Sequence, residues 1–163
     1  MTVHQLPMHI TMFVSSFIAG IALYYLISME HLQAFLQLVE PVVLTESETQ
    51  QLYIIIRTAL TFLVITIFAS HPLLSIVSYF VIAMKIVLFS LCSMYIVIEH
   101  QNVLAYCFWW FPIQLVQCIV LIIYYTRMKL LKGKSVQVIA TIILFILIEI
   151  VILLAELVII RYV

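Results

Sequence analysis

Five long apolar runs constrain this chain more than any other feature of its sequence. A helix that crosses the hydrocarbon core of a bilayer, roughly 30 Å thick, needs about 20 mostly apolar residues. Runs of this kind cover residues 8–28, 51–70, 73–98, 103–126 and 136–160. They are continuous rather than alternating, which disfavours the strands of a membrane β-barrel. The sequence therefore predicts an all-α, polytopic membrane helix bundle of about five transmembrane helices, forming a single transmembrane domain over residues 1–163.

The composition excludes a soluble globular domain. Hydrophobic residues make up 67% of the 163 residues and charged residues only 9%, whereas soluble domains have roughly 45–50% apolar and about 25% charged residues. A small soluble domain has too much surface for its volume to hide so many apolar side chains. Membrane lipid is the expected solvent, and the zero net charge gives no indication of nucleic-acid binding.

Residues 29–40, between the first two spans, follow a different pattern. Apolar side chains recur at helical spacing, and polar side chains occupy the remaining positions; the apolar set is Leu32, Phe35, Leu36 and Val39. The segment is too short and too polar to span the bilayer. It predicts an amphipathic helix that lies at the membrane surface and ends before Pro41.

The basic residues predict the orientation of the chain. Four of the seven lie between the fourth and fifth spans: Arg127, Lys129, Lys132 and Lys134. Short loops rich in Lys and Arg remain in the cytoplasm. With five spans, the N-terminus is then cytoplasmic and the C-terminus extracytoplasmic. The same loop is the natural docking surface for a cytoplasmic partner.

Three ionisable residues are predicted to lie deep in the membrane. Lys85 is near the middle of the third span, and Glu149 is at similar depth in the fifth, with Glu156 nearer the outer face. An isolated charge at the helix centre costs about 2.5–3.5 kcal/mol on insertion scales. We therefore expect Lys85 and Glu149 to form an intramembrane ion pair. Three interpretations stay open: a structural pair, a contact with another subunit, and a proton relay, ion relay or substrate site.

A bulky polar-aromatic patch marks the fourth span. Trp109 and Trp110 precede Pro112 and Gln114. Proline lacks a backbone donor, so Pro112 is expected to kink the helix. The aromatic side chains either pack against lipid and neighbouring helices or form a contact surface for another membrane subunit or a hydrophobic peptide.

Motifs for catalysis or metal binding are not found. The chain has no Asp, no HExxH and no Walker motif, and its five histidines are scattered. We expect no catalytic residue, metal ion or cofactor, and any ATP must be handled by a separate protein.

The order of these features resembles the stage II sporulation protein M family of small five-span bacterial membrane proteins. The similar segments are Phe17-Ile18-Ala19-Gly20 in the first span, Phe80 to Ser90 with Lys85 in the third, and Phe111-Pro112-Ile113-Gln114-Leu115 in the fourth. Lys85 is the only functional residue that the resemblance carries over. The chain looks most like the short members found in gene clusters for circular bacteriocins.

The resemblance implies a non-enzymatic protein of the bacterial cytoplasmic membrane. The first hypothesis is a subunit of a multi-component complex that pairs with an ATP-binding protein in the maturation, export or immunity of a hydrophobic bacteriocin. The second is a scaffold that recruits extracytoplasmic cell-wall enzymes. The third is a small stand-alone transporter that uses Lys85 and Glu149.

Overall fold

The chain folds into a bundle of long helices. The computed structural model describes residues 5–40, 49–71, 74–99, 103, 106–131 and 135–160. In chain order its helices are α1 (Gln5–Leu26), α2 (Met29–Val39), α3 (Thr49–Ser70), α4 (Ser75–Ile98), the π-helix η2 (Tyr106–Trp110), α6 (Phe111–Leu130) and α7 (Ser135–Ile160). The predicted all-α membrane helix bundle is confirmed.

Five helices are long enough to cross a bilayer. Among the described residues, four are also apolar enough on average: Pro7–Leu26, Ser75–Ile98, Tyr106–Leu130 and Val136–Glu156. The fifth, α3, has a shorter apolar stretch over Ile54–Ala69, because polar residues occupy its first turn. Its 22 residues nevertheless extend about 33 Å at a rise of 1.5 Å per residue.

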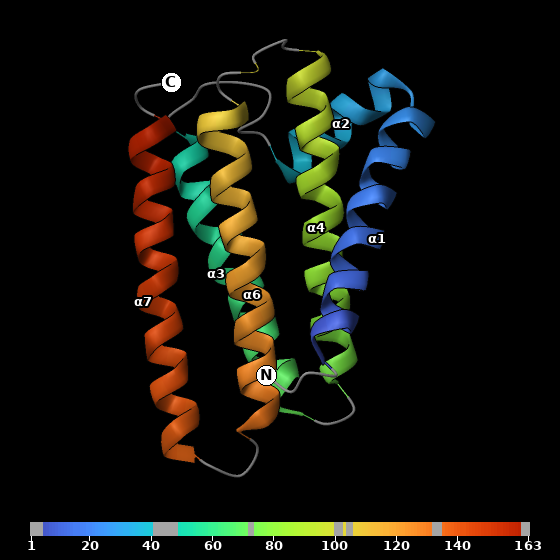
Figure 1. Ribbon diagram of the computed structural model, residues 1–163. Coiled ribbons are helices and arrows are strands. Elements are labelled where there is room, and N and C mark those ends of the chain that lie inside the picture. The colour runs from blue at the N-terminus through green and yellow to red at the C-terminus, as the bar shows by residue number, and fades with distance from the viewer. Residues whose placement is uncertain are drawn as a thin grey trace.

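The long helices alternate in direction (Figure 1). α1, α4 and α7 run one way, while α3 and α6 run the other way. α1 therefore begins at the end of the bundle where α6 ends and α7 begins. α7 ends at the opposite end, where α2 lies. The basic residues Arg127 and Lys129 at the end of α6 and the acidic residue Glu30 of α2 therefore lie at opposite ends of the molecule.

α1 and α4 form the closest helix pair, and a glycine permits it. A Cβ added at Gly20 would overlap the side chain of Ser90 and the carbonyl oxygen of Val87. Ser16, one turn earlier on the same face of α1, is also buried. Small residues spaced four apart let helix backbones approach in this way. At the far end of the pair, the hydroxyl of Tyr24 donates a 2.8 Å hydrogen bond to Glu99.

α2 is amphipathic, and its end turns into the bundle. Leu32 and Leu36 are fully buried, while Glu30 and Gln33 are exposed. Glu40, directly after the helix, is only 1% exposed. The last residue of the segment predicted to lie at the membrane surface is therefore buried inside the bundle. The apolar face of α2 packs down onto the bundle, which carries the last carboxylate inward.

Pro112 lies just after a π-helical stretch inside one continuous span, Tyr106–Leu130. η2 ends at Trp110 and α6 begins at Phe111, so Pro112 sits in the first helical turn. Proline has no N–H to donate and its ring clashes with the carbonyl four residues earlier. A π-helical turn, which is rare and short, fits such a site. The structure has a π-helical turn directly before the first turn of α6, and the kink expected at Pro112 stays a prediction.

Candidate intramembrane charge site

Five ionisable side chains from four segments gather inside the bundle. They come from the end of α2, from α3, from α4 and from α7, and we call them the charge cluster: Glu40, Arg57, Lys85, Glu149 and Glu156. Four of them lie on mostly apolar long helices, and Glu40 follows the end of α2, so the bundle itself must supply their counter-charges.

Glu40 joins two of the cations. One of its carboxylate oxygens accepts a hydrogen bond from Nη1 of Arg57. The other, Oε1, lies 3.6 Å from Nζ of Lys85. Since the Glu40 side chain is almost completely buried, this carboxylate fixes the end of α2 against both α3 and α4.

Glu156 is held by a second set of donors. Its Oε1 lies 3.9 Å from Nη2 of Arg57 and 3.3 Å from Nε2 of Gln114. Its other oxygen accepts from Nε2 of Gln117 at 3.3 Å. Arg57 therefore lies between two carboxylates, and the two glutamines of α6 solvate Glu156 in place of water.

The predicted Lys85–Glu149 ion pair does not form, and this is corrected. Lys85 pairs with Glu40 instead. Glu149 and Lys85 do line one small cavity together with Arg57 and Gln117. Lys85 and Glu149 were predicted to lie at similar depths, but depth along two helices does not determine which side chains meet. The inward turn of Glu40 supplies a nearer partner for the ammonium.

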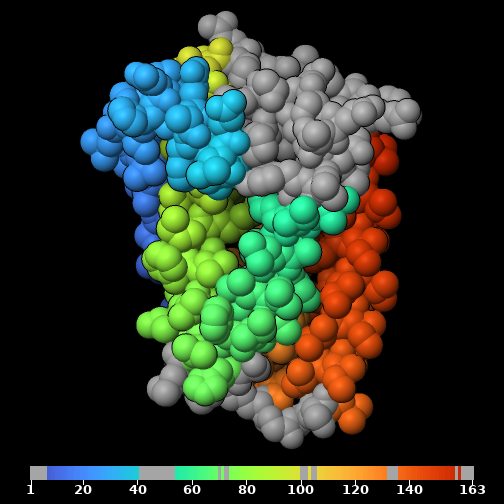
Figure 2. Space-filling model, turned by 180° about the vertical axis from the view of Figure 1, so that it is seen from behind, coloured from blue at the N-terminus to red at the C-terminus, as the bar shows by residue number. Residues whose placement is uncertain are grey.

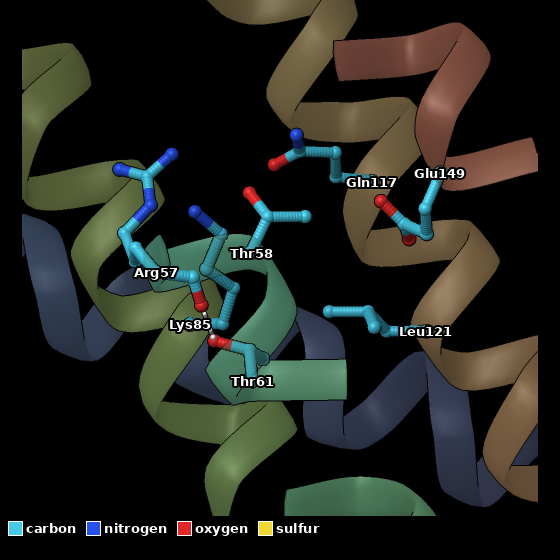
Figure 3. Close-up of a pocket in the computed structure, with 7 residues that line it drawn as sticks. All are labelled: Arg57, Thr58, Thr61, Lys85, Gln117, Leu121 and Glu149. Atoms are coloured by element: carbon cyan, nitrogen blue, oxygen red, sulfur yellow. Dashed lines mark hydrogen bonds between the residues drawn. The ribbon is translucent and has the colours of Figure 1, made fainter. Parts of the chain in front are cut away.

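The cavity between these groups is small. Its volume is about 10 Å³, which is room for about one water molecule. Figure 3 shows the amine of Lys85 beside Arg57 and Thr58 on one wall, with Gln117 and Glu149 on the other. The Oε1 atom of Glu149 is buried and has no hydrogen-bond partner among the described residues.

The other predicted site residues lie elsewhere. Arg127 and Lys129 are exposed on the last turn of α6, and Lys132 and Lys134 lie outside the described residues. Trp110 is buried at 1% exposure, whereas Trp109 is only partly buried. Trp110 is therefore part of the core of the bundle rather than of an outer contact surface.

Sequence reasoning missed three members of the site: Glu40, Arg57 and Gln117. The guanidinium of Arg57 points inward to Glu40 and Glu156. A signal was present, since an arginine inside an apolar run requires a partner. Gln114 and Gln117, three residues apart on one helix face, also indicated a polar interior.

In the part of the chain that the structure describes, His, Cys and Glu side chains form no group of three or more that could hold a metal ion. No protein-family model matches the chain, and no curated protein or solved structure matches it.

Proposed function

We propose that this chain is a non-enzymatic subunit of a multi-component complex in the bacterial cytoplasmic membrane. The complex handles or exports a hydrophobic peptide, such as a circular bacteriocin, and a separate ATP-binding protein supplies the energy. The resemblance to short members of the stage II sporulation protein M family supports this role.

The pairing of both intramembrane cations is the observation that carries the proposal. Arg57 and Lys85 are both engaged by carboxylates of the same chain. A cavity of about 10 Å³ lies between them and Glu149, and a larger one of about 220 Å³ lies beside Glu40, Arg57 and Lys85. A stand-alone transporter needs a polar path through the membrane, usually at broken helices. An ionic network whose cations are already paired instead holds helices in register, as expected of a subunit whose cargo moves with the help of partners.

The basic end of α6 is the proposed docking surface for the ATP-binding protein. Arg127 and Lys129 are exposed in the last helical turn, and Lys132 and Lys134 follow within five residues in the sequence. Exposed basic groups of this kind steer acidic partner surfaces toward the membrane. The positive-inside rule places this end in the cytoplasm, where ATP is available.

The test is purification of the tagged chain from its native membrane, followed by measurement of ATP hydrolysis in the purified complex. We expect an ATPase to copurify, and the double charge reversal R127E/K129E to lower the copurified activity at least tenfold. E30K, a charge reversal at the opposite end of the bundle, is the matched control and should retain the activity. Copurification of a cell-wall hydrolase without an ATPase would instead favour the scaffold.

A further inference from the structure

A second, larger cavity lies between α3 and α7 and opens on the outside of the bundle. Its volume is about 410 Å³, within the roughly 300–1,000 Å³ range of small-molecule sites. Its walls are almost entirely apolar and include Phe62, Leu63, Ile146 and Ile150. Figure 2 shows α3 and α7 beside one another on the face where this groove lies.

Glu149 connects this groove with the charge cluster. It lines both the groove and the small polar cavity, and so does Thr58 of α3. The Glu149 residue is only 7% exposed, and its Oε1 has no hydrogen-bond partner in the described part of the chain. A buried polar atom without a partner costs about 1–3 kcal/mol, and more when it carries charge. A ligand that supplied the partner would recover this free energy.

The charges of the cluster define what that partner should carry. Two cations, Arg57 and Lys85, face three carboxylates, so the fully ionised cluster has a formal charge of 2 − 3 = −1. The ion pairs of the described residues join the cations to Glu40 and Glu156. Glu149 is the carboxylate left over, and it faces an apolar groove.

We propose that the groove between α3 and α7 is a binding site for a lipophilic monocation. The apolar body of the ligand lies against the isoleucine, leucine and phenylalanine side chains, and its single positive charge lies next to Glu149. A neutral acyl chain would fill the groove but leave Oε1 of Glu149 without a partner. A hydrated inorganic cation would meet apolar walls, where it loses its water shell without replacement.

This site lies within one chain and needs no partner protein. It therefore goes beyond the proposed role in a complex, and either proposal can fail without the other. In the complex, the same groove would provide a place for a small amphiphilic cation at the lipid-facing side of the bundle.

The probe is tetraphenylphosphonium, a bulky apolar cation, and its same-sized anionic counterpart tetraphenylborate is titrated in a separate sample, because the two ions form a sparingly soluble salt. Equilibrium binding is measured with the purified full chain in lipid nanodiscs. We expect saturable binding of the cation at one site per chain, with E149Q lowering the affinity at least tenfold and tetraphenylborate showing no saturable binding. The matched control E30Q removes an exposed carboxylate of α2 and should bind as the unaltered chain does.

A second variant keeps the test decisive if E149Q does not fold. A59F retains Glu149 and places a phenyl ring in the groove, which Ala59 lines, so it should lower the affinity for the bulky cation at least fivefold. Equal binding of the cation by E149Q, or equal saturable binding of tetraphenylborate, would overturn the proposal because partition into an apolar surface would then suffice. Efficient disulfide dimerisation of I146C that prevents binding of the probe would also overturn the proposal. A second copy of the chain would then cover the groove.

Discussion

Arg57 connects three segments that are far apart in the sequence. Its guanidinium pairs with Glu40 at the end of α2 and with Glu156 near the end of α7. The Arg57 side chain is 14% exposed, and both carboxylates are almost completely buried. Loss of one partner from a buried pair leaves an uncompensated charge, which is far more costly than loss of a surface pair.

Replacement of Arg57 by methionine is therefore expected to destabilise the bundle by about 3–5 kcal/mol. Methionine retains a long unbranched side chain but removes the positive charge that neutralises both carboxylates. The measurement is reversible unfolding of the purified chain in mixed micelles. R127M, which removes an exposed arginine, should change stability by about 0.5 kcal/mol or less.

A double change sharpens this test. If Arg57 and Glu40 pair directly, E40Q should be far less harmful in the R57M background than in the unaltered chain. Simple addition of the two effects would contradict direct pairing.

The residues of the site were only partly predictable from the sequence. Lys85 and Glu149 could be recognised because ionisable residues are rare in apolar runs. The partner of Lys85 could not be, because Glu40 lies outside every span and reaches the site only through the tertiary packing of α2. The hydrogen bond from Gln117 to Glu156 was also not predictable, because it depends on the relative rotation of α6 and α7.

At the scale of elements, the sequence predicted much more. The predicted spans 8–28 and 73–98 correspond to α1 (Gln5–Leu26) and α4 (Ser75–Ile98). This agreement has a physical cause, since backbone groups in lipid must be satisfied within the helix itself. The lengths of the apolar runs do not predict which helices pack together or where the π-turn before α6 lies. Both depend on side-chain contacts between segments.

The contact of α1 with α4 leads to a prediction at Gly20. Even G20A places a methyl group against Ser90 and the carbonyl oxygen of Val87, and the backbone atom cannot be moved aside by a rotamer change. We expect a loss of about 1–3 kcal/mol, measured by thermal or denaturant unfolding in micelles. A19V adds more volume at the neighbouring exposed position and should have little effect. An unchanged stability of G20A would show that α1 does not approach α4 this closely.

At the scale of the whole molecule, the long helices alternate in direction. The side of the membrane on which one loop lies therefore determines the side of every other helix end. The beginning of α1 and the end of α7 lie at opposite ends of the molecule (Figure 1). Four basic residues follow one another over 127–134 at the end where α6 meets α7, and the described polar residues at the other end include exposed Glu30 and Glu99. The positive-inside rule therefore predicts a cytoplasmic loop between α6 and α7.

Cysteine labelling of intact cells tests this orientation. In a chain with C107S, which removes the exposed native cysteine, we expect Q101C to react with a membrane-impermeant maleimide. G133C, between α6 and α7, should react only after permeabilisation, because the basic loop holds that end inside. Replacement of all four basic residues of this loop by glutamine should give a mixed population in which both positions label in intact cells. Labelling of G133C alone in intact cells would reverse the orientation and place the proposed ATPase-docking surface where no ATP is available.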